Sequence, residues 1–136
     1  MFYILDGKNP VAVSNIDEVK ALMGTDRRKR LVRRTSLKKG HLEVDVSTVF
    51  LCFDHVPGGD KPVLFETVAF NMNVPNDTDM CTRYNTWDES EAGHEIIVKG
   101  FLEQGYLMIS DQRRHNDLEE DLKETSRFEL MDMEDE

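Results

Sequence analysis

Residues 42–54 read LEVDVSTVFLCFD, and this stretch decides the fold class that the sequence predicts. Apolar residues alternate at Leu42, Val44 and Val46, which is typical of a strand with one buried face. From Val49 to Phe53 every residue is apolar, which indicates that both faces of the strand are covered there. We therefore expect a long strand over 42–54 whose second half is enclosed.

A loop rich in turn residues follows at 55–61, and residues 63–72 predict the returning strand. We expect Asp54 to pair with Pro62, so that Phe50 lies opposite Glu66. Strand alternation then places four side chains on one face of the hairpin: Phe50, Cys52, Asp54 and Glu66. In this register Asp54 and Glu66 are roughly 13 Å apart. That separation excludes a glycosidase-like carboxylate pair, which needs ~5–10 Å.

Helical spacing and capping boxes predict two helices, at 15–24 and 87–104. Asn15 with Glu18 and Thr86 with Glu89 form the two boxes. Further short strands are predicted at 2–6, 11–13, 30–36, 80–85 and 106–110. Together these elements predict an α+β fold: an antiparallel sheet of about five strands with two main helices on one face.

Composition divides the chain into one domain and an acidic extension. Residues 1–110 have enough apolar content for a single core, whereas eleven of the last 26 residues are acidic and four are basic. We expect residues 111–136 to be mobile or weakly helical. The chain has no signal-peptide pattern, no apolar run long enough to cross a bilayer and two cysteines, so we expect a protein of a reducing cytoplasm.

Several sequence blocks, in order, carry a resemblance to a known family. They are YILDG at 3–7, STVFL at 47–51 with Asp54-His55, PVLFET at 62–67, and Arg83-Tyr84, Thr86-Trp87, Glu89 and Glu91-Ala92-Gly93-His94. The blocks cover most of residues 2–98 and resemble a family of small uncharacterised proteins of tailed bacteriophages and related bacterial sequences. The resemblance implies a phage-encoded accessory product in the cytoplasm of an infected bacterial host, and it supplies no established activity. The basic stretch at 27–39 and residues 106–136 depart from the family pattern.

Four side chains are candidates for catalysis because their types suit acid–base or hydrolytic chemistry: His55, Glu66, Tyr84 and His94. A metal-assisted site would need His55, His94 and a carboxylate to converge. The spacing does not require this, and the alternative is that His94 packs at the helix and forms structural hydrogen bonds. Cys52 lies among apolar residues, where burial raises the thiol pKa. No phosphate-binding glycine loop is present, and we expect no metal or cofactor.

The charge distribution suggests surfaces for partners. Residues 1–40 hold ten Lys/Arg and four Asp/Glu (+6), and residues 41–136 hold seven and 23 (−16), which sum to the net charge of −10. The candidate partner-binding residues are Arg27, Arg28, Arg30, Arg33 and Arg34, and Glu119, Glu120 and Asp121. The arginines could contact nucleic acid, but no aromatic residue accompanies them between 24 and 40, so we favour a contact with the chain's own acidic tail or with an acidic partner.

Three functions follow from these patterns. The first is an accessory protein that binds and modulates a host or viral protein without catalysis. The second is a small hydrolytic enzyme, with or without metal assistance, that uses His55, Glu66 and His94. The third is a nucleic-acid-binding protein that uses residues 27–34. Convergence of the two histidines with a carboxylate in one cleft would favour the enzyme.

Overall fold

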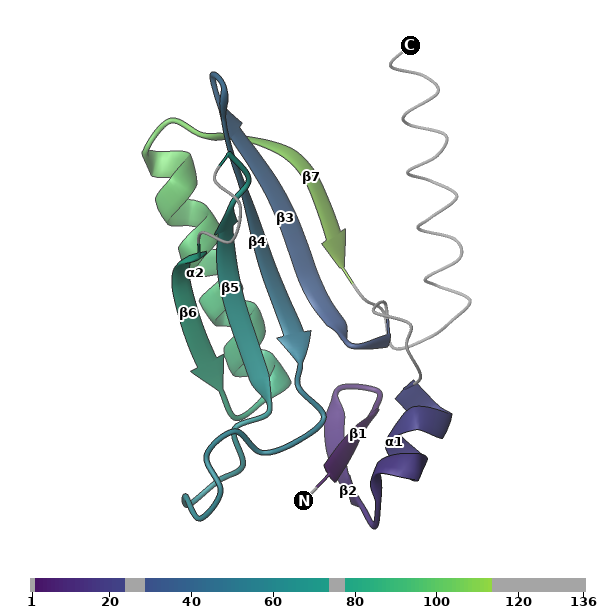
Figure 1. The fold of residues 1–136 in the computed structure, drawn as a ribbon. Helices are drawn as coiled ribbons and strands as arrows, with labels where there is room; N and C mark the ends of the chain where they lie inside the picture. Colours follow the sequence, from purple (N-terminus) through teal and green to yellow (C-terminus); the bar gives the residue numbers. More distant parts are fainter. Residues whose placement is uncertain (1, 24–28, 74–77, 114–136) are drawn as a thin grey trace.

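The computed structural model describes residues 2–23, 29–73 and 78–113, and it confirms the α+β fold with a five-stranded antiparallel sheet and two helices (Figure 1). The strand order in the sheet is β6–β5–β4–β3–β7, and β1 and β2 form a separate hairpin. The elements are β1 (Phe2–Asp6), β2 (Asn9–Val13), α1 (Ile16–Met23), β3 (Leu31–Lys39), β4 (Leu42–Phe50), β5 (Phe65–Asn71), β6 (Thr78–Tyr84), α2 (Trp87–Glu103) and β7 (Leu107–Arg113).

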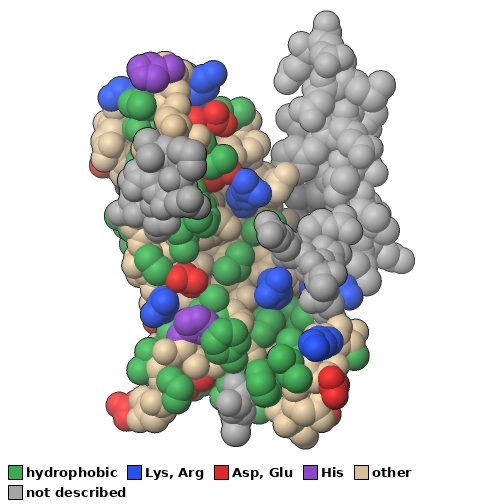
Figure 2. Space-filling model, viewed as in Figure 1, with side chains coloured by type: hydrophobic (Ala, Val, Ile, Leu, Met, Phe, Trp, Pro, Cys, Tyr) green, Lys and Arg blue, Asp and Glu red, His purple; other side chains and the backbone are tan. Residues whose placement is uncertain are grey.

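Helix α2 covers one face of the sheet, from β3 to β6. Figure 2 shows the opposite face, on which apolar and charged side chains are both exposed. The helix begins at the predicted capping box, where Thr86 Oγ1 accepts a hydrogen bond of 3.1 Å from the Glu89 amide. Its buried side chains recur at helical spacing and face the sheet: Trp87, Ser90, His94 and Val98. Trp87 anchors the first turn, because its ring packs edge-on against Phe65 with the centroids 6.3 Å apart.

A close approach between α2 and β6 depends on Gly93. A Cβ atom placed on Gly93 would overlap the ring and hydroxyl of Tyr84, whereas a Cβ on Gly100 in the same helix would meet nothing within 4 Å. The Tyr84 hydroxyl is buried and has no hydrogen-bond partner. The absence of a side chain at Gly93 therefore lets the helix rest directly on Tyr84.

The apolar core has two parts under α2. One is built from alternating strand residues and the middle of the helix: Leu37, Val44, Val46, Ala69 and Val98. The other lies toward the β1–β2 hairpin and contains Met23, Val32, Phe50, Cys52, Leu64, Phe65 and Trp87. Burial of these side chains is the main driving force for the fold.

Helix α1 packs against β1 and β2 beyond one end of the sheet (Figure 1). Its predicted capping box is present, since Asn15 Oδ1 accepts from the Glu18 amide at 3.1 Å and Glu18 accepts from the Ser14 amide at 3.0 Å. Met23 connects this unit to the main core. The two predicted helices are thus both present, and α2 is the one that covers the sheet, while the predicted helix end at Gly24 lies outside the described residues.

The predicted register of the β4–β5 hairpin is wrong by one residue. Glu66 lies opposite Val49, and Phe50 lies opposite Phe65. Strand β4 ends at Phe50, and the next residues leave the alternation because Cys52 has a left-handed backbone with φ of 66°. A slip of one residue moves each side chain to the other face, so Glu66 lies on the face opposite to Phe50.

Strand β7 is longer than predicted and extends from Leu107 to Arg113, next to β3. Residues 111–113 are therefore part of the sheet, and residues 114–136 lie outside the described part of the chain. Within the described ranges, no helix is both long and apolar enough to cross a membrane.

Candidate functional site

His94 is the centre of a buried polar network between α2 and the sheet. Its side chain is fully inaccessible to solvent. Thr35 Oγ1 lies 2.8 Å from His94 Nε2, and Thr48 Oγ1 lies 2.7 Å from His94 Nδ1. Thr48 Oγ1 is also 2.5 Å from Thr67 Oγ1. Both nitrogens of the imidazole therefore have partners from the sheet, which agrees with the prediction that His94 forms structural hydrogen bonds.

The network determines which nitrogen of His94 carries the proton. Thr35 Oγ1 donates to Asp111 Oδ1 at 2.9 Å, because an ionised carboxylate can only accept. Thr35 must then accept from His94 Nε2–H, which leaves Nδ1 to accept from the Thr48 hydroxyl. Thr48 accepts in turn from Thr67. The hydrogen bonds thus run in one direction, from Thr67 through His94 to Asp111.

The Arg33 guanidinium completes the network at its outer end. Arg33 is buried, and it donates from Nε to Asp111 Oδ1 at 2.8 Å and from Nη2 to Asp111 Oδ2 at 3.1 Å. Arg33 Nη1 also forms an ion pair with Glu95 of α2. These contacts join three elements, β3, β7 and α2, through one side chain. The bidentate geometry is the strong form of an arginine–carboxylate interaction.

The surroundings shift the pKa values of the network in favour of a neutral histidine and charged partners. Burial, followed by the nearby Arg33 charge, lowers the pKa of His94 to about 4. Burial alone would raise the pKa of Asp111, but hydrogen bonds from Arg33 and Thr35 outweigh it and the pKa is lowered. The hydrogen bond from Arg33 lowers the pKa of Glu95 as well. His94 is therefore neutral at pH 7, which is consistent with the tautomer derived above.

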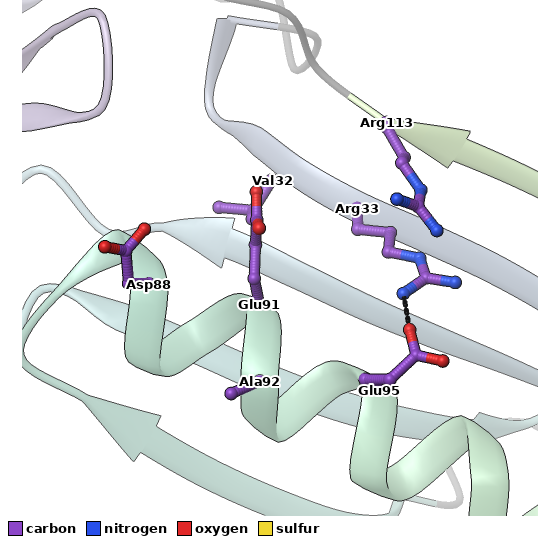
Figure 3. A pocket seen from close by; sticks show the side chains of 7 residues that line it. All are labelled: Val32, Arg33, Asp88, Glu91, Ala92, Glu95 and Arg113. Carbon is purple, nitrogen blue, oxygen red and sulfur yellow. Dashed lines mark hydrogen bonds and ion pairs between the residues drawn. The ribbon is translucent and has the colours of Figure 1, made fainter.

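A groove lies between α2 and the ends of β3 and β7, with a volume of about 410 Å³ (Figure 3). Its lining residues are Val32, Arg33, Asp88, Glu91, Ala92, Glu95 and Arg113. Arginines from the strands face carboxylates from the helix across it, and the Arg33–Glu95 ion pair bridges the two sides. Glu91 accepts from Trp87 Nε1 at 2.5 Å. The Arg33–Glu95 ion pair therefore holds the helix to the sheet at this groove.

The four predicted catalytic residues lie in different environments, and none of them lines the groove. His94 is buried between α2 and the sheet, and Tyr84 packs against Gly93 on the same face of the sheet. Glu66 is on the other face, where it accepts from Cys81 Sγ at 2.8 Å and lies 3.6 Å from Arg83 Nε. His55 is in the loop after β4 and stacks on Phe53, with the ring centroids 4.5 Å apart. The structure thus does not bring His94 and Glu66 together.

The described part of the chain contains no group of three or more His, Cys, Asp or Glu side chains arranged to hold a metal ion. Asp54, another residue of the hairpin loop, accepts from the amides of Val63 and Val56, and these hydrogen bonds lower its pKa. Both cysteines are free. Burial raises the pKa of the Cys52 thiol, as predicted, and the hydrogen bond to Glu66 raises that of Cys81.

The predicted partner-binding arginines are distributed between the interior and the surface. Arg33 belongs to the buried network, and Arg30 has a buried Nε beside Cys52. Arg34 is half exposed and forms an ion pair with Asp45 on the face opposite to α2. The other predicted partner-binding residues lie outside the described ranges: Arg27, Arg28, Glu119, Glu120 and Asp121.

Strand β7 has a feature that the sequence reasoning missed. Its first three residues are apolar and exposed: Leu107 by 74%, Met108 by 43% and Ile109 by 55%. The run Leu-Met-Ile predicts a strand, but a short apolar run does not show whether its side chains are covered. Leu107 lies opposite Lys38 on the face of the sheet away from α2. Met108 lies opposite Leu37 on the same face as α2, but the main contacts of the helix are with β3 to β6.

No protein-family model matches this chain, and neither the curated proteins nor the solved structures contain a significant match to it. The geometry described above is therefore the basis for a functional proposal.

Proposed function

We propose that this chain acts by binding another protein, through the exposed apolar residues of β7. The observation that supports this proposal is the run Leu107–Ile109 on a strand at the edge of the sheet. Exposed apolar patches on a folded domain commonly mark interaction sites. Leu107 alone keeps about three quarters of its surface in contact with water, so a partner that covers the run gains the free energy of burying it.

The use of the reactive side chains is consistent with a binding role. Both nitrogens of His94 are hydrogen-bonded inside the fold, and in the groove Arg33 pairs with Glu95 across the interface between β3 and α2. His55 and Glu66 lie at separate places on the surface. His94, Arg33 and Glu95 thus contribute to the stability of the scaffold that presents β7.

The resemblance to small tailed-phage proteins suggests where such a partner would be found. In this proposal the chain is an accessory protein of an infected bacterial cell, and it binds and modulates a host or viral protein in the cytoplasm.

The test is affinity capture with the tagged full chain from bacterial cells, followed by reconstitution of binding with the purified captured protein. The double variant Leu107→Lys/Ile109→Lys introduces charge on β7, and Ile96→Lys is the matched control, because Ile96 is equally exposed on the outer side of α2. We expect one discrete protein to bind the wild type and the Ile96 variant and to lose binding at least about tenfold with the β7 variant. Capture that does not depend on β7, or no specific capture, would contradict the proposal.

A further inference from the structure

The outer edge of β7 has no strand partner among the described residues. β7 pairs on one side with β3, and it is the last strand in the sheet order. In an antiparallel edge strand, alternate residues direct their amide and carbonyl groups away from the sheet, where another extended chain can pair with them. The exposed apolar residues 107–109 lie on this strand. The edge therefore offers both backbone hydrogen bonds and apolar contact.

Natural edge strands are usually protected against such pairing, and the opposite edge of the sheet shows this protection. β6 carries Met80 as its exposed large apolar residue, followed by exposed Cys81, Thr82 and Arg83. β7 instead begins with three consecutive exposed apolar residues. The two edges of one sheet therefore differ, and β7 is the one suited to accept a strand.

The charges beside the first residue of β7 are basic, although the whole chain has a net charge of −10. Lys38 lies opposite Leu107 and is exposed, and Lys39 reaches the Gln104 carbonyl oxygen at 2.7 Å. At the other end of the strand Arg113 lies 3.4 Å from Asp111 and lines the groove with Glu91 and Glu95, so its charge is balanced by acids. The basic charge is therefore at the start of β7, where it attracts negative charge within a Debye length of about 8–10 Å.

Side-chain contacts hold β7 in place before any partner binds. Asp111 joins the strand to Arg33 and Thr35 of β3 through hydrogen bonds of 2.8–3.1 Å. Through Arg33 the strand is also connected to Glu95 of α2. A strand that is already ordered loses little conformational entropy on binding, so more of the contact energy appears as affinity.

We infer that the β7 edge accepts an extended, acidic segment of a partner protein as an additional strand of the sheet. This inference rests on the proposed function and specifies its partner chemistry. The main-chain hydrogen bonds supply affinity, as in other cases of strand addition. Apolar side chains of the segment cover Leu107 and Ile109, and its carboxylates lie near Lys38.

The experiment is selection of short random peptides against the full-length protein, without any bias toward a sequence. We expect the enriched peptides to be rich in Asp and Glu alternating with β-branched or aromatic residues. Measured by fluorescence anisotropy, their affinity should fall about tenfold or more with Leu107→Glu and severalfold with Lys38→Glu. It should change less than about twofold with Ile96→Glu, the matched exposed residue of α2.

Hydrogen exchange locates the bound peptide. The inference requires slower exchange of amides in Leu107–Arg113 when peptide is bound, with no change in Thr78–Tyr84. Thermal unfolding of the Leu107 and Ile96 variants verifies that both fold, which we expect because both side chains are largely exposed.

Several results would overturn the inference. They are the absence of enriched peptides, enrichment of basic peptides, protection at β6, and undiminished binding to the Leu107 variant. Tighter peptide binding after the combined substitutions Glu119→Gln, Glu120→Gln and Asp121→Asn would show that the chain's own acidic residues compete for the edge. Self-association that is lost with Leu107→Glu would show that a second copy of the chain binds there. A captured cell protein that needs Leu107 while acidic peptides do not bind would refute this inference and leave the proposed function standing.

Discussion

On the face of the sheet that α2 covers, Thr35, Thr48 and His94 form hydrogen bonds from which water is excluded, whereas on the opposite face Glu66, Cys81 and Arg83 interact at the surface. In the first case every donor has a partner that is itself fixed by another element of the fold. In the second case water can replace a lost partner. Removal of a single group should therefore be costly on the covered face and nearly neutral on the open face.

The largest effect is expected from His94→Leu. The variant leaves the Thr48 hydroxyl without its acceptor and Thr35 without its donor, both in a buried site, so we expect a loss of about 3 kcal/mol in the free energy of unfolding. The matched control is His41→Leu, since His41 is exposed in the turn between β3 and β4, and it should change stability by less than about 0.5 kcal/mol. Urea denaturation measures both. Equal losses would show that the buried hydrogen bonds of His94 do not stabilise the covered face.

Gly93→Ala tests the packing of the covered face. Alanine normally stabilises a helix by up to ~1 kcal/mol relative to glycine, but here its methyl group would overlap Tyr84, so we expect a destabilisation of about 2 kcal/mol. Gly100→Ala in the same helix meets no neighbour and should be neutral or stabilising. Combining Gly93→Ala with Tyr84→Leu should restore part of the loss. A stabilising Gly93→Ala variant would show that the helix does not rest on Tyr84.

The pH dependence of stability sharpens the comparison, because it isolates the burial of His94. The folded pKa of about 4 lies below the ordinary value of 6.5, so between these values the unfolded chain binds the additional proton. Stability is therefore complete above about pH 6.5 and falls as the pH decreases toward the folded pKa. We expect a loss of about 2 kcal/mol between about pH 7 and pH 5.

His94→Leu should remove most of this loss, and His41→Leu should retain it. The measurements end near pH 5 because Asp111 and Glu95, whose pKa values are also lowered, contribute at more acidic pH. A wild-type stability that is constant between pH 7 and pH 5 would contradict the neutral, buried state of His94.

The smallest effect concerns the two thiols. Cys81 is exposed on the open face and Cys52 is buried, so a thiol reagent should modify Cys81 in the folded protein and Cys52 only on unfolding. Because the hydrogen bond to Glu66 raises the pKa of Cys81, Glu66→Gln should increase its rate of modification severalfold. Mass spectrometry after timed labelling measures both sites. Modification of Cys52 first would reverse the assignment of the two environments.

Local patterns in the sequence predicted most of the fold. The alternation of Leu42, Val44 and Val46 and the capping box at Thr86 each depend on residues close together in the chain, and both are present in the structure. The register of β4 and β5 was not predictable in this way. It depends on the left-handed backbone at Cys52, a residue type for which no local rule suggests that conformation.

The polar network around His94 could not be predicted from local patterns, because its residues are far apart in the chain. Arg33 and Asp111 are 78 residues apart, and Thr35 and His94 are 59 apart. The charge count indicated an exposed basic surface at 27–34, but Arg33 is drawn into the fold by acids from α2 and β7. The exposure of Leu107 could not be predicted from local patterns either, because it depends on which face of the sheet α2 covers, and Leu107 lies with Lys38 on the other face.

The position of β7 next to β3 has a consequence during protein synthesis. β7 leaves the ribosome after the other strands of the sheet and after α2. The outer edge of β3 therefore stays unpaired while most of the domain is translated. An uncovered edge at that stage invites aggregation of nascent chains. β3 contains Arg33, Arg34, Lys38 and Lys39, and charged residues in a strand oppose such premature pairing. The basic residues of β3 thus oppose aggregation of the nascent chain until β7 has been translated and pairs with β3.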